Sequence, residues 1–323
     1  MKQNLQKIIY YATQAPSSHN TQPWKFKIEE QRILIYPDYS RTLEIADADR
    51  HELYISLGCA LENLVVAARH FDYATTVRIN TEGEIFIEVT LRPMAQSKDD
   101  SLFDQIVLRQ STRNLYDGKP IPAHYIEVLR SSAMRENVDC RILTGFDEIS
   151  TVTELVKEAC IRQYSDEAFV DELLEWVRFN ESNAVKKLDG IHSAATGKPG
   201  VPNWLGKLIV GSTSPKSQAD AIEELVKSSS GLVFFIAGNN DVKSLINLGR
   251  SFERFALTAT SFNINLAHVN MPCEVPSVRH KLSNLLGLKG TETPLLLLRI
   301  GYSQKMPYSY RRPVEQVVEE GLF

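Results

Sequence analysis

The chain has 323 residues, of which 43% are hydrophobic and 24% charged, a composition that allows a sizeable buried core. Its formal net charge is only −4 and it has no basic tail, so neither a nucleic-acid-binding role nor an anionic-membrane role is supported. The most apolar runs, 231–238 and 294–300, are far shorter than the ~20 residues that span a bilayer.

The four cysteines, Cys59, Cys140, Cys160 and Cys273, are scattered and form no CxxC pair. Lone thiols at such spacing are typical of core residues in a reducing compartment. The polar N-terminal residues contain no apolar signal core. We therefore expect a cytoplasmic protein without a metal site.

The first section of the chain alternates helices and strands. An N-terminal helix places Leu5, Ile8, Ile9 and Ala12 on one face and ends before Pro16, because proline cannot donate to a helix ladder. Periodicity then predicts two strands within 25–36, a long helix over 53–70, and a strand pair at 76–79 and 85–91.

The second section is longer and contains a change of character at 189–217. Glycine and proline are frequent there, so we expect a long irregular segment around Trp204 that acts as a lid or substrate wall, or else as a mobile surface loop. The other expected elements are helices at 101–109, 125–132, 150–180 and 242–267, and strands at 138–143, 231–238 and 294–300.

Two of the long helices share a pattern. In the first, Gly58 precedes Glu62 by four residues and Ala68 by ten. Gly249, Glu253 and Ala259 repeat this spacing in the second, 191 residues later. The second helix is apolar nearly all round, as expected for a helix inside a large core. The pattern indicates two halves that are distant copies of one unit.

Common catalytic motifs (GxSxG, HExxH, GxGxxG after a strand) are absent, and three polar clusters remain. The first is the segment 16–24, Pro-Ser-Ser-His-Asn-Thr-Gln-Pro-Trp. Its short polar and amide side chains could form a capped loop, since such residues favour turns. Alternatively, they offer many donors and acceptors beside an aromatic ring, which suits the polar edge of a flat heterocycle.

The other two clusters are basic. Arg109 and Arg113 flank Gln110, Ser111 and Thr112, so two guanidiniums and two hydroxyls could together hold a phosphate. Arg311-Arg312-Pro313 lies near the C-terminus. Each cluster could be a solvated charged surface. Because neither has acidic neighbours in the sequence, the two clusters also fit a shared anion.

Together these segments resemble the FMN-dependent nitroreductase family, and most closely its Acg-like subgroup, in which two nitroreductase-like halves are fused. Segment 16–24 resembles the family's flavin loop, 109–113 resembles its phosphate-binding Arg-x-Ser-x-Arg, and 311–313 its C-terminal phosphate arginines. Segment 271–275 resembles the Pro-x-Glu-Gly loop near flavin N5, although Val275 replaces the common glycine.

The resemblance implies an α+β, nitroreductase-like fold, which is an internally duplicated pseudo-dimer with central mixed or antiparallel sheets flanked by helices. We expect one half at 1–100 and the other at 101–323, with a lid-like insertion at about 145–225, the two halves forming one intertwined domain. The implied FMN-binding residues are Ser17, Ser18, His19, Asn20, Gln22, Arg109, Gln110, Ser111, Arg113, Glu274, Val275, Arg311 and Arg312.

The flavin loop lies in the first half and the Arg-x-Ser-x-Arg cluster in the second. The second half has Ser-Ser-Ala-Met-Arg-Glu-Asn at 131–137, where its own loop would be, without Gln-Pro-Trp. We therefore expect one composite site per chain, one degenerate site, and a monomer or weak homodimer.

By the resemblance, the protein is an FMN-dependent oxidoreductase with a ping-pong reaction. NAD(P)H reduces the flavin, and an electron-poor acceptor such as a nitroaromatic or quinone takes up the hydride. No side-chain acid or base is predicted. Two alternatives are an FMN-binding storage or sensing protein, and a flavin-free interaction protein.

Overall fold

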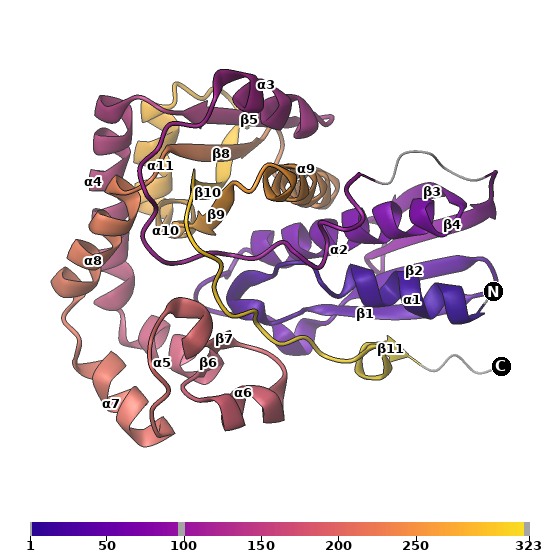
Figure 1. The fold of residues 1–323 in the computed structure, drawn as a ribbon, viewed down its shortest axis with the longest axis horizontal. Coiled ribbons are helices and arrows are strands. Elements are labelled where there is room, and N and C mark those ends of the chain that lie inside the picture. The colour runs from indigo at the N-terminus through magenta and orange to yellow at the C-terminus, as the bar shows by residue number, and fades with distance from the viewer. Residues whose placement is uncertain (1, 96–100, 320–323) are drawn as a thin grey trace.

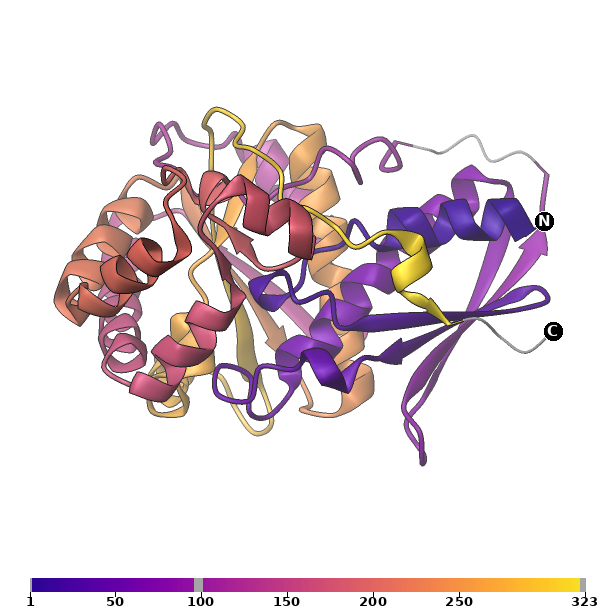
Figure 2. The same cartoon turned by 90° about the horizontal axis from the view of Figure 1, so that it is seen from below.

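The computed structural model describes residues 2–95 and 101–319, and their architecture is α+β, as the sequence predicts. One sheet has five strands in the order β11-β1-β2-β4-β3, and a second has four in the order β5-β8-β10-β9. Figures 1 and 2 show the first sheet at one end of the molecule and the helices of the insertion at the opposite end. No helix among the described residues is long and apolar enough to cross a membrane.

The first part of the chain forms the five-stranded sheet and two helices. Its elements are α1 (Lys2–Ala12), β1 (Trp24–Glu29), β2 (Arg32–Pro37), α2 (His51–His70), β3 (Tyr73–Asn80) and β4 (Phe86–Pro93). The fifth strand comes from the C-terminus. After β10 the chain crosses the molecule (yellow in Figure 1), and β11 (Val318–Glu319) pairs in parallel with β1.

The second part forms the four-stranded sheet around a second long helix. Its elements are α3 (Ala123–Ser132), β5 (Val138–Leu143), β8 (Gly231–Ala237), α9 (Val242–Ser261), β9 (Asn265–His268), α10 (Met271–Glu274), α11 (Pro276–Leu285) and β10 (Thr293–Gly301). Between β5 and β8 lie α4 (Phe146–Tyr164), α5 (Glu167–Trp176), β6 (Val177–Arg178), α6 (Glu181–Lys187), β7 (Ile191–His192), α7 (Asn203–Ser212) and α8 (Pro215–Lys227).

The internal duplication is visible in the topology. In each half a helix precedes two strands, a long helix and two more strands. The strand orders β1-β2-β4-β3 and β5-β8-β10-β9 correspond one to one, and every neighbouring pair in both series is antiparallel. The halves differ in their connections, because the turns after β1 and β3 are replaced in the second half by the insertion and by α10 and α11.

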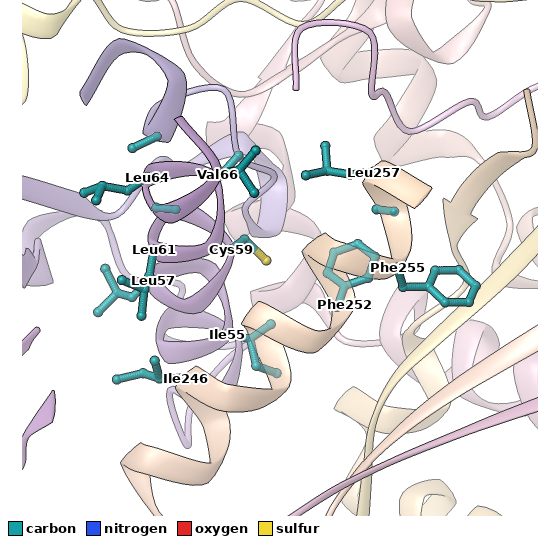
Figure 3. Close-up of a cluster of buried hydrophobic side chains, with 14 of the residues drawn as sticks. Ile55, Leu57, Cys59, Leu61, Leu64, Val66, Ile246, Phe252, Phe255 and Leu257 are labelled. Atoms are coloured by element: carbon teal, nitrogen blue, oxygen red, sulfur yellow. The ribbon is translucent and has the colours of Figure 1, made fainter. Parts of the chain in front are cut away.

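Helices α2 and α9 cross at the centre of the molecule (Figures 1 and 3). The two glycines of the repeated pattern, Gly58 and Gly249, lie at the crossing. A Cβ atom on Gly58 would overlap the carbonyl oxygen of Ile246, and one on Gly249 would overlap that of Ile55. Since residues 55 and 58 match 246 and 249 at the same offset, the contact is symmetric. A pseudo-twofold axis therefore passes between the two glycines.

Four expected elements differ from the structure. The helical stretch expected at 150–180 is divided into α4 and α5, with Ser165 and Asp166 between them, and it ends at β6. Residues 101–108 form successive turns instead of a helix, with hydrogen bonds from residue i to i−3, and Phe103, Ile106 and Arg109 are buried at the matching three-residue spacing. The helix expected over 242–267 ends at Ser261, since Asn263 adopts a left-handed conformation (φ 55°) and the chain continues as β9.

The segment 189–217 is more ordered than expected. It contains β7, a 3₁₀ turn at Ser193–Thr196, all of α7 and the start of α8. Several of its prolines and glycines occur at the ends of these elements: Pro202 precedes α7, Pro215 begins α8, and Gly197 ends the 3₁₀ turn in a left-handed conformation. Prolines and glycines predict the boundaries of these elements. The helices between them are too short to show a clear hydrophobic periodicity.

Candidate functional site

A cavity of about 420 Å³ lies where the two halves meet the insertion. Three of the predicted segments reach it, through Ser17, Ser18, His19, Ser111, Arg113 and Glu274. Helix α2 forms another wall with Glu52, Ile55, Ser56 and Cys59. A smaller cavity of about 240 Å³, between Gly118 and Lys227, contains none of the predicted site residues.

The loop after α1 is held in an unusual backbone conformation. His19, Asn20 and Gln22 have φ values of 47°, 55° and 53°, in the left-handed region that non-glycine residues rarely adopt. Each such residue costs of order 1–3 kcal/mol and persists only where surrounding contacts fix it. Strain of this kind is frequent at ligand-binding sites, and here the loop presents Ser17, Ser18 and His19 to the cavity.

The two amide side chains of this loop provide the fixing contacts. Asn20 Nδ2 donates to the carbonyl oxygens of Gly190 and Tyr310, each at 3.1 Å. Gln22 Nε2 donates to the carbonyl oxygen of Leu188 at 2.9 Å, and the Gln22 side-chain oxygen accepts from the Arg312 backbone at 2.8 Å. Neither amide lines the cavity. They tie the loop to the insertion and to the C-terminal segment.

The cavity has an unmatched positive charge. Arg113 lines it, and within the described part of the chain this guanidinium has no hydrogen bond or ion pair. Burial and Arg113 together lower the pKa of His19 to about 4 and, with a contribution from Arg109, that of His268 to about 3. Both imidazoles are therefore neutral at pH 7, and the Nδ1 atom of His19 is buried without a partner.

The other predicted arginines lie around Arg113 but have protein partners. Arg109 is 3.2 Å from the buried carboxylate of Glu253. Arg311 donates to Asn20 Oδ1 at 3.0 Å, and its pKa falls to about 9 because it is buried close to Arg109 and Arg113. Three guanidiniums are thus brought together, as the prediction of a shared anion requires. Arg312 faces away from them, with Asp38 at 3.9 Å.

Two other predicted residues make structural contacts instead of reaching the cavity. The Gln110 side chain donates to and accepts from the backbone of Met306, at 3.0 Å and 2.7 Å. Val275 precedes the first turn of α11 and is not among the lining residues. The cofactor-binding roles of both residues stay predictions.

The cavity is also lined by two carboxyl groups, Glu52 and Glu274, of which the sequence predicts only Glu274 as a site residue. Glu52 accepts a hydrogen bond from Asn270 Nδ2 at 2.6 Å, and Glu274 accepts one from Gln163 Nε2 at 2.5 Å. Burial and the neighbouring Glu274 raise the pKa of Glu52 to about 8. The signal for Glu52 was its place in an Asp-Ala-Asp-Arg-His-Glu run just before an apolar helix.

The insertion supplies the apolar wall. Its lining side chains come from α4, α5 and α8 and include Tyr164, Phe169, Leu173, Ile222 and Leu225. The segment 189–217 also reaches the cavity, through Ile191 and Lys198, but Trp204 does not, because its side chain lies on α7 and is 69% exposed. Helix α7 lies at the outer edge of the insertion (Figure 1).

A buried ion-pair cluster anchors the insertion to the first half. Asp189 is 2.5 Å from Arg41 and 2.6 Å from Arg178, and the side chains of Asp189 and Arg178 are at most 9% exposed. Arg41 also donates to the carbonyl oxygen of Thr21, in the loop 16–24 that resembles the family's flavin loop. The cover of the cavity and the loop beneath it are therefore held by one charge cluster.

The pseudo-twofold axis relates this cavity to a second position, where an ion-pair cluster surrounds Glu62. At the 191-residue offset, Cys59 on the cavity wall corresponds to Arg250, and Asn63 corresponds to Arg254. Both arginines bind the buried carboxylate of Glu62, at 2.9 Å and 2.5 Å, and Arg135 joins them at 2.6 Å. The residue that corresponds to Glu62 at the 191-residue offset is Glu253, which pairs with Arg109 instead.

Comparisons with known proteins agree with the sequence motifs. No family model matches the chain. A Mycobacterium tuberculosis protein with the provisional name NAD(P)H nitroreductase Rv3131 is 24% identical over 325 residues, covering 97% of this chain and 90% of that protein. The Acg protein of the same species, also provisionally named an NAD(P)H nitroreductase, is 22% identical over 327 residues, covering 97% and 94%.

Among solved structures, nitroreductase A of Vibrio parahaemolyticus superposes with a TM-score of 0.43 and 12% identity, covering 70% of this chain and 77% of that protein. The sequence matches extend over both halves and the insertion, and they include Acg itself. The resemblance of this chain to the nitroreductase family, and to its Acg-like members, is therefore confirmed over nearly its whole length.

Proposed function

We propose that this chain binds one FMN in the 420 Å³ cavity and works as an FMN-dependent NAD(P)H oxidoreductase. The observation that carries the proposal is Arg113, a half-buried cation that lines the cavity beside the loop 16–24 and has no partner among the described residues. A buried charge without a counterion is costly, so the site favours an anionic ligand.

The residues present fit the parts of FMN. Arg113 and Ser111, with Arg109 and Arg311 close by, would hold the phosphate, because guanidiniums and a hydroxyl match its oxygens. Ser17, Ser18 and the unpartnered His19 Nδ1 would serve the ribityl chain and the polar ring edge. Asn20, Gln22 and Arg312 would act indirectly, by fixing the loop.

Bound FMN would supply two-electron chemistry, since it accepts a hydride from NAD(P)H and passes it to an acceptor. The protein contributes the position and a water-poor environment. The Tyr164, Phe169 and Ile222 side chains favour a flat, weakly polar acceptor, and quinones and nitroaromatics belong to this class. The names of Rv3131 and Acg, as NAD(P)H nitroreductases, support both the donor and this type of acceptor.

The ion-pair cluster at the pseudo-symmetric position supports one site per chain. Arg250, Arg254 and Arg135 occupy the region around Glu62 that matches the cavity wall around Cys59. An aromatic cofactor there would have to displace three arginines from one buried carboxylate. The same comparison supports the division into a half at 1–100 and a half at 101–323, with an insertion at about 145–225.

The second candidate function is FMN storage or sensing. The observation that favours it is the insertion, which covers the cavity and is anchored through Asp189, so acceptor access depends on how far this cover opens. A protein that binds flavin under a closed cover would need the same phosphate and ring contacts.

One experiment separates these functions. The absorption spectrum of the purified protein should show a flavin, and anaerobic mixing with NADH and with NADPH should bleach its band within seconds. A flavin that persists with both nucleotides would indicate storage. A colourless protein that does not take up added FMN would contradict the proposal altogether.

A further inference from the structure

Two acidic side chains meet inside the cavity although they come from opposite halves of the molecule. Glu52 lies in the first turn of α2, and Glu274 ends α10. Both line the cavity, and the two carboxyl groups are hydrogen-bonded to each other. A hydrogen bond between two carboxyl groups requires a proton on one of them, because ionised carboxylates have no donor.

The surroundings keep this proton on Glu52. Two amides hold the pair in place, since Asn270 Nδ2 donates to Glu52 and Gln163 Nε2 donates to Glu274. Asn270 is itself fixed, because its side-chain oxygen accepts from the backbone of Leu297 at 2.9 Å. Burial and the Glu274 charge raise the pKa of Glu52 to about 8, and burial raises the pKa of Glu274 as well, so the pair holds a proton at pH 7, which we assign to Glu52.

The charged neighbours of Glu52 do not lower its pKa enough to ionise it. His51 is the adjacent base, and it pairs with Asp47 and Asp49; its charge lowers the pKa of Glu52, but burial and Glu274 outweigh this effect. Asp47 accepts from the backbone of Glu52 and faces the same carboxyl group, which disfavours a second negative charge. Arg279, the arginine nearest α10, pairs with Asp49 at 3.0 Å.

We propose that the Glu52–Glu274 pair is the proton donor to the bound acceptor. This inference rests on the proposed function. A hydride brings two electrons and one proton to a quinone and leaves a negative charge on its oxygen. In the proposed step the O–H bond of Glu52 breaks, an O–H bond forms on the acceptor, and Glu52 is left as a carboxylate. Glu52 then regains a proton from solvent.

The pair also defines the acceptor more closely. A proton donor in the cavity, with Tyr164 and Phe169 of the apolar wall beside it, suits a planar molecule with an oxygen that becomes basic on reduction. Quinones and nitro compounds have such an oxygen. An acceptor that takes electrons alone, such as ferricyanide, would gain nothing from Glu52.

The test uses the FMN-loaded protein with Glu52→Gln, Glu274→Gln and, as a matched control, Glu44→Gln at an exposed carboxyl group outside the cavity. The protein is first reduced with NADPH or NADH under anaerobic conditions and then mixed with 1,4-benzoquinone. For Glu52→Gln we expect re-oxidation to slow by about 10²- to 10⁴-fold, the usual contribution of a general acid. Re-oxidation by ferricyanide and reduction by the nicotinamide should be unchanged.

Two further readouts separate proton donation from a structural role. In the wild type the rate constant of quinone re-oxidation should fall above about pH 8, where Glu52 loses its proton, and this dependence should vanish in Glu52→Gln. Infrared difference spectra between pH 6 and pH 10 should show a protonated carboxyl band in the wild type and in Glu44→Gln. The band should be absent in Glu52→Gln.

The outcomes also distinguish this inference from the proposed function. Normal reduction by nicotinamide with unchanged quinone re-oxidation in both glutamate variants would overturn the proton donor and leave the oxidoreductase intact. Equal slowing with benzoquinone and ferricyanide would overturn it as well, because the defect would then not concern a proton. A protein that no nicotinamide reduces would overturn both.

Discussion

Two ionisable groups that line the cavity, Arg113 and Glu52, differ in their charge at pH 7. Arg113 keeps its charge and has no counterion among the described residues. The pKa of Glu52 is raised to about 8, so this carboxyl group is neutral at pH 7. Neutral His19 and His268 lie near Arg113. The site therefore offers an anion position and a proton within one cavity, which matches the phosphate of FMN and the acceptor of its electrons.

Arg113→Ala tests the anion position. Removing one charged hydrogen-bond donor from the phosphate should cost about 1.5–3 kcal/mol of FMN binding free energy, which is roughly a 10- to 150-fold rise in Kd. Flavin fluorescence quenching during titration of the flavin-free protein measures this constant. Arg32→Ala, an exposed arginine on β2, is the control and should bind FMN like the wild type. An Arg113→Ala protein with unchanged Kd would refute the phosphate role.

Glu52 should also make stability depend on pH. In the folded chain its pKa is about 8, whereas the ordinary value is 4.5, so between these pH values the folded state holds a proton that the unfolded state has released. The stabilisation is complete below pH 4.5 and is lost as pH rises through 8. The free energy of unfolding of Glu52→Gln, relative to the wild type, should therefore increase from pH 5 to pH 9. Urea denaturation across this range measures it, and a constant difference would contradict the raised pKa.

At the scale of elements, the sequence predicts helices and strands well where one periodicity continues for many residues. The strand at 138–143 and the start of the helix at 242 agree with the structure. Prediction fails where apolar spacing suits two structures. Phe103 and Ile106 suit an α-helix or successive 3₁₀ turns, and Ile264 and Leu266 suit a helix or a strand. Tertiary contacts decide such cases, and a local pattern does not contain them.

The crossing of α2 and α9 gives a prediction for each glycine. Gly58→Ala and Gly249→Ala should each destabilise the fold by about 1–3 kcal/mol, because a Cβ atom on either residue meets the backbone of the other helix. The double variant should lose less than the sum, since both methyl groups force apart the same crossing. Chemical denaturation with urea measures these losses.

Gly211→Ala is the control for these variants. Gly211 lies in α7, its φ is not positive, and a Cβ atom there would meet nothing within 4 Å. Since alanine favours helix more than glycine by about 1 kcal/mol, this variant should be as stable as the wild type or more stable. Equal stability of Gly58→Ala and Gly211→Ala would show that the helices can separate without cost.

Asp189 provides a test of the insertion as a cover. Asp189→Asn leaves Arg41 and Arg178 buried without their carboxylate, and breaking a buried ion pair from one side costs about 3–5 kcal/mol. Because these residues join the insertion to the first half, amide hydrogen exchange should quicken in 177–192 and stay unchanged in the two main sheets. Asp171→Asn, at an exposed carboxylate of α5, is the control. Unchanged exchange in 177–192 would mean that the cluster does not hold the cover.

At the scale of the whole molecule, the site could be predicted in its parts more easily than in its assembly. The motifs at 16–24 and 109–113 are short and chemically distinct, so sequence alone selected Ser17, His19 and Arg113. Glu52 was missed because one acidic residue at a helix start is ordinary in sequence. Its meaning depends on Glu274, which lies 222 residues away and reaches it only through the fold.

A site assembled from both halves of one chain predicts a definite stoichiometry. The purified holoprotein should contain close to one FMN per chain, because Arg250, Arg254 and Arg135 surround Glu62 at the pseudo-symmetric position. Residues of both halves of a single chain, Ser17 and His19 with Ser111 and Arg113, line one cavity, so we expect a Kd for FMN that does not change with protein concentration. Flavin released by acid, counted against protein, gives the ratio, and light scattering during titration gives the mass of the binding species. A ratio near two would show a second functional site, and binding that weakens on dilution would show a site shared between chains.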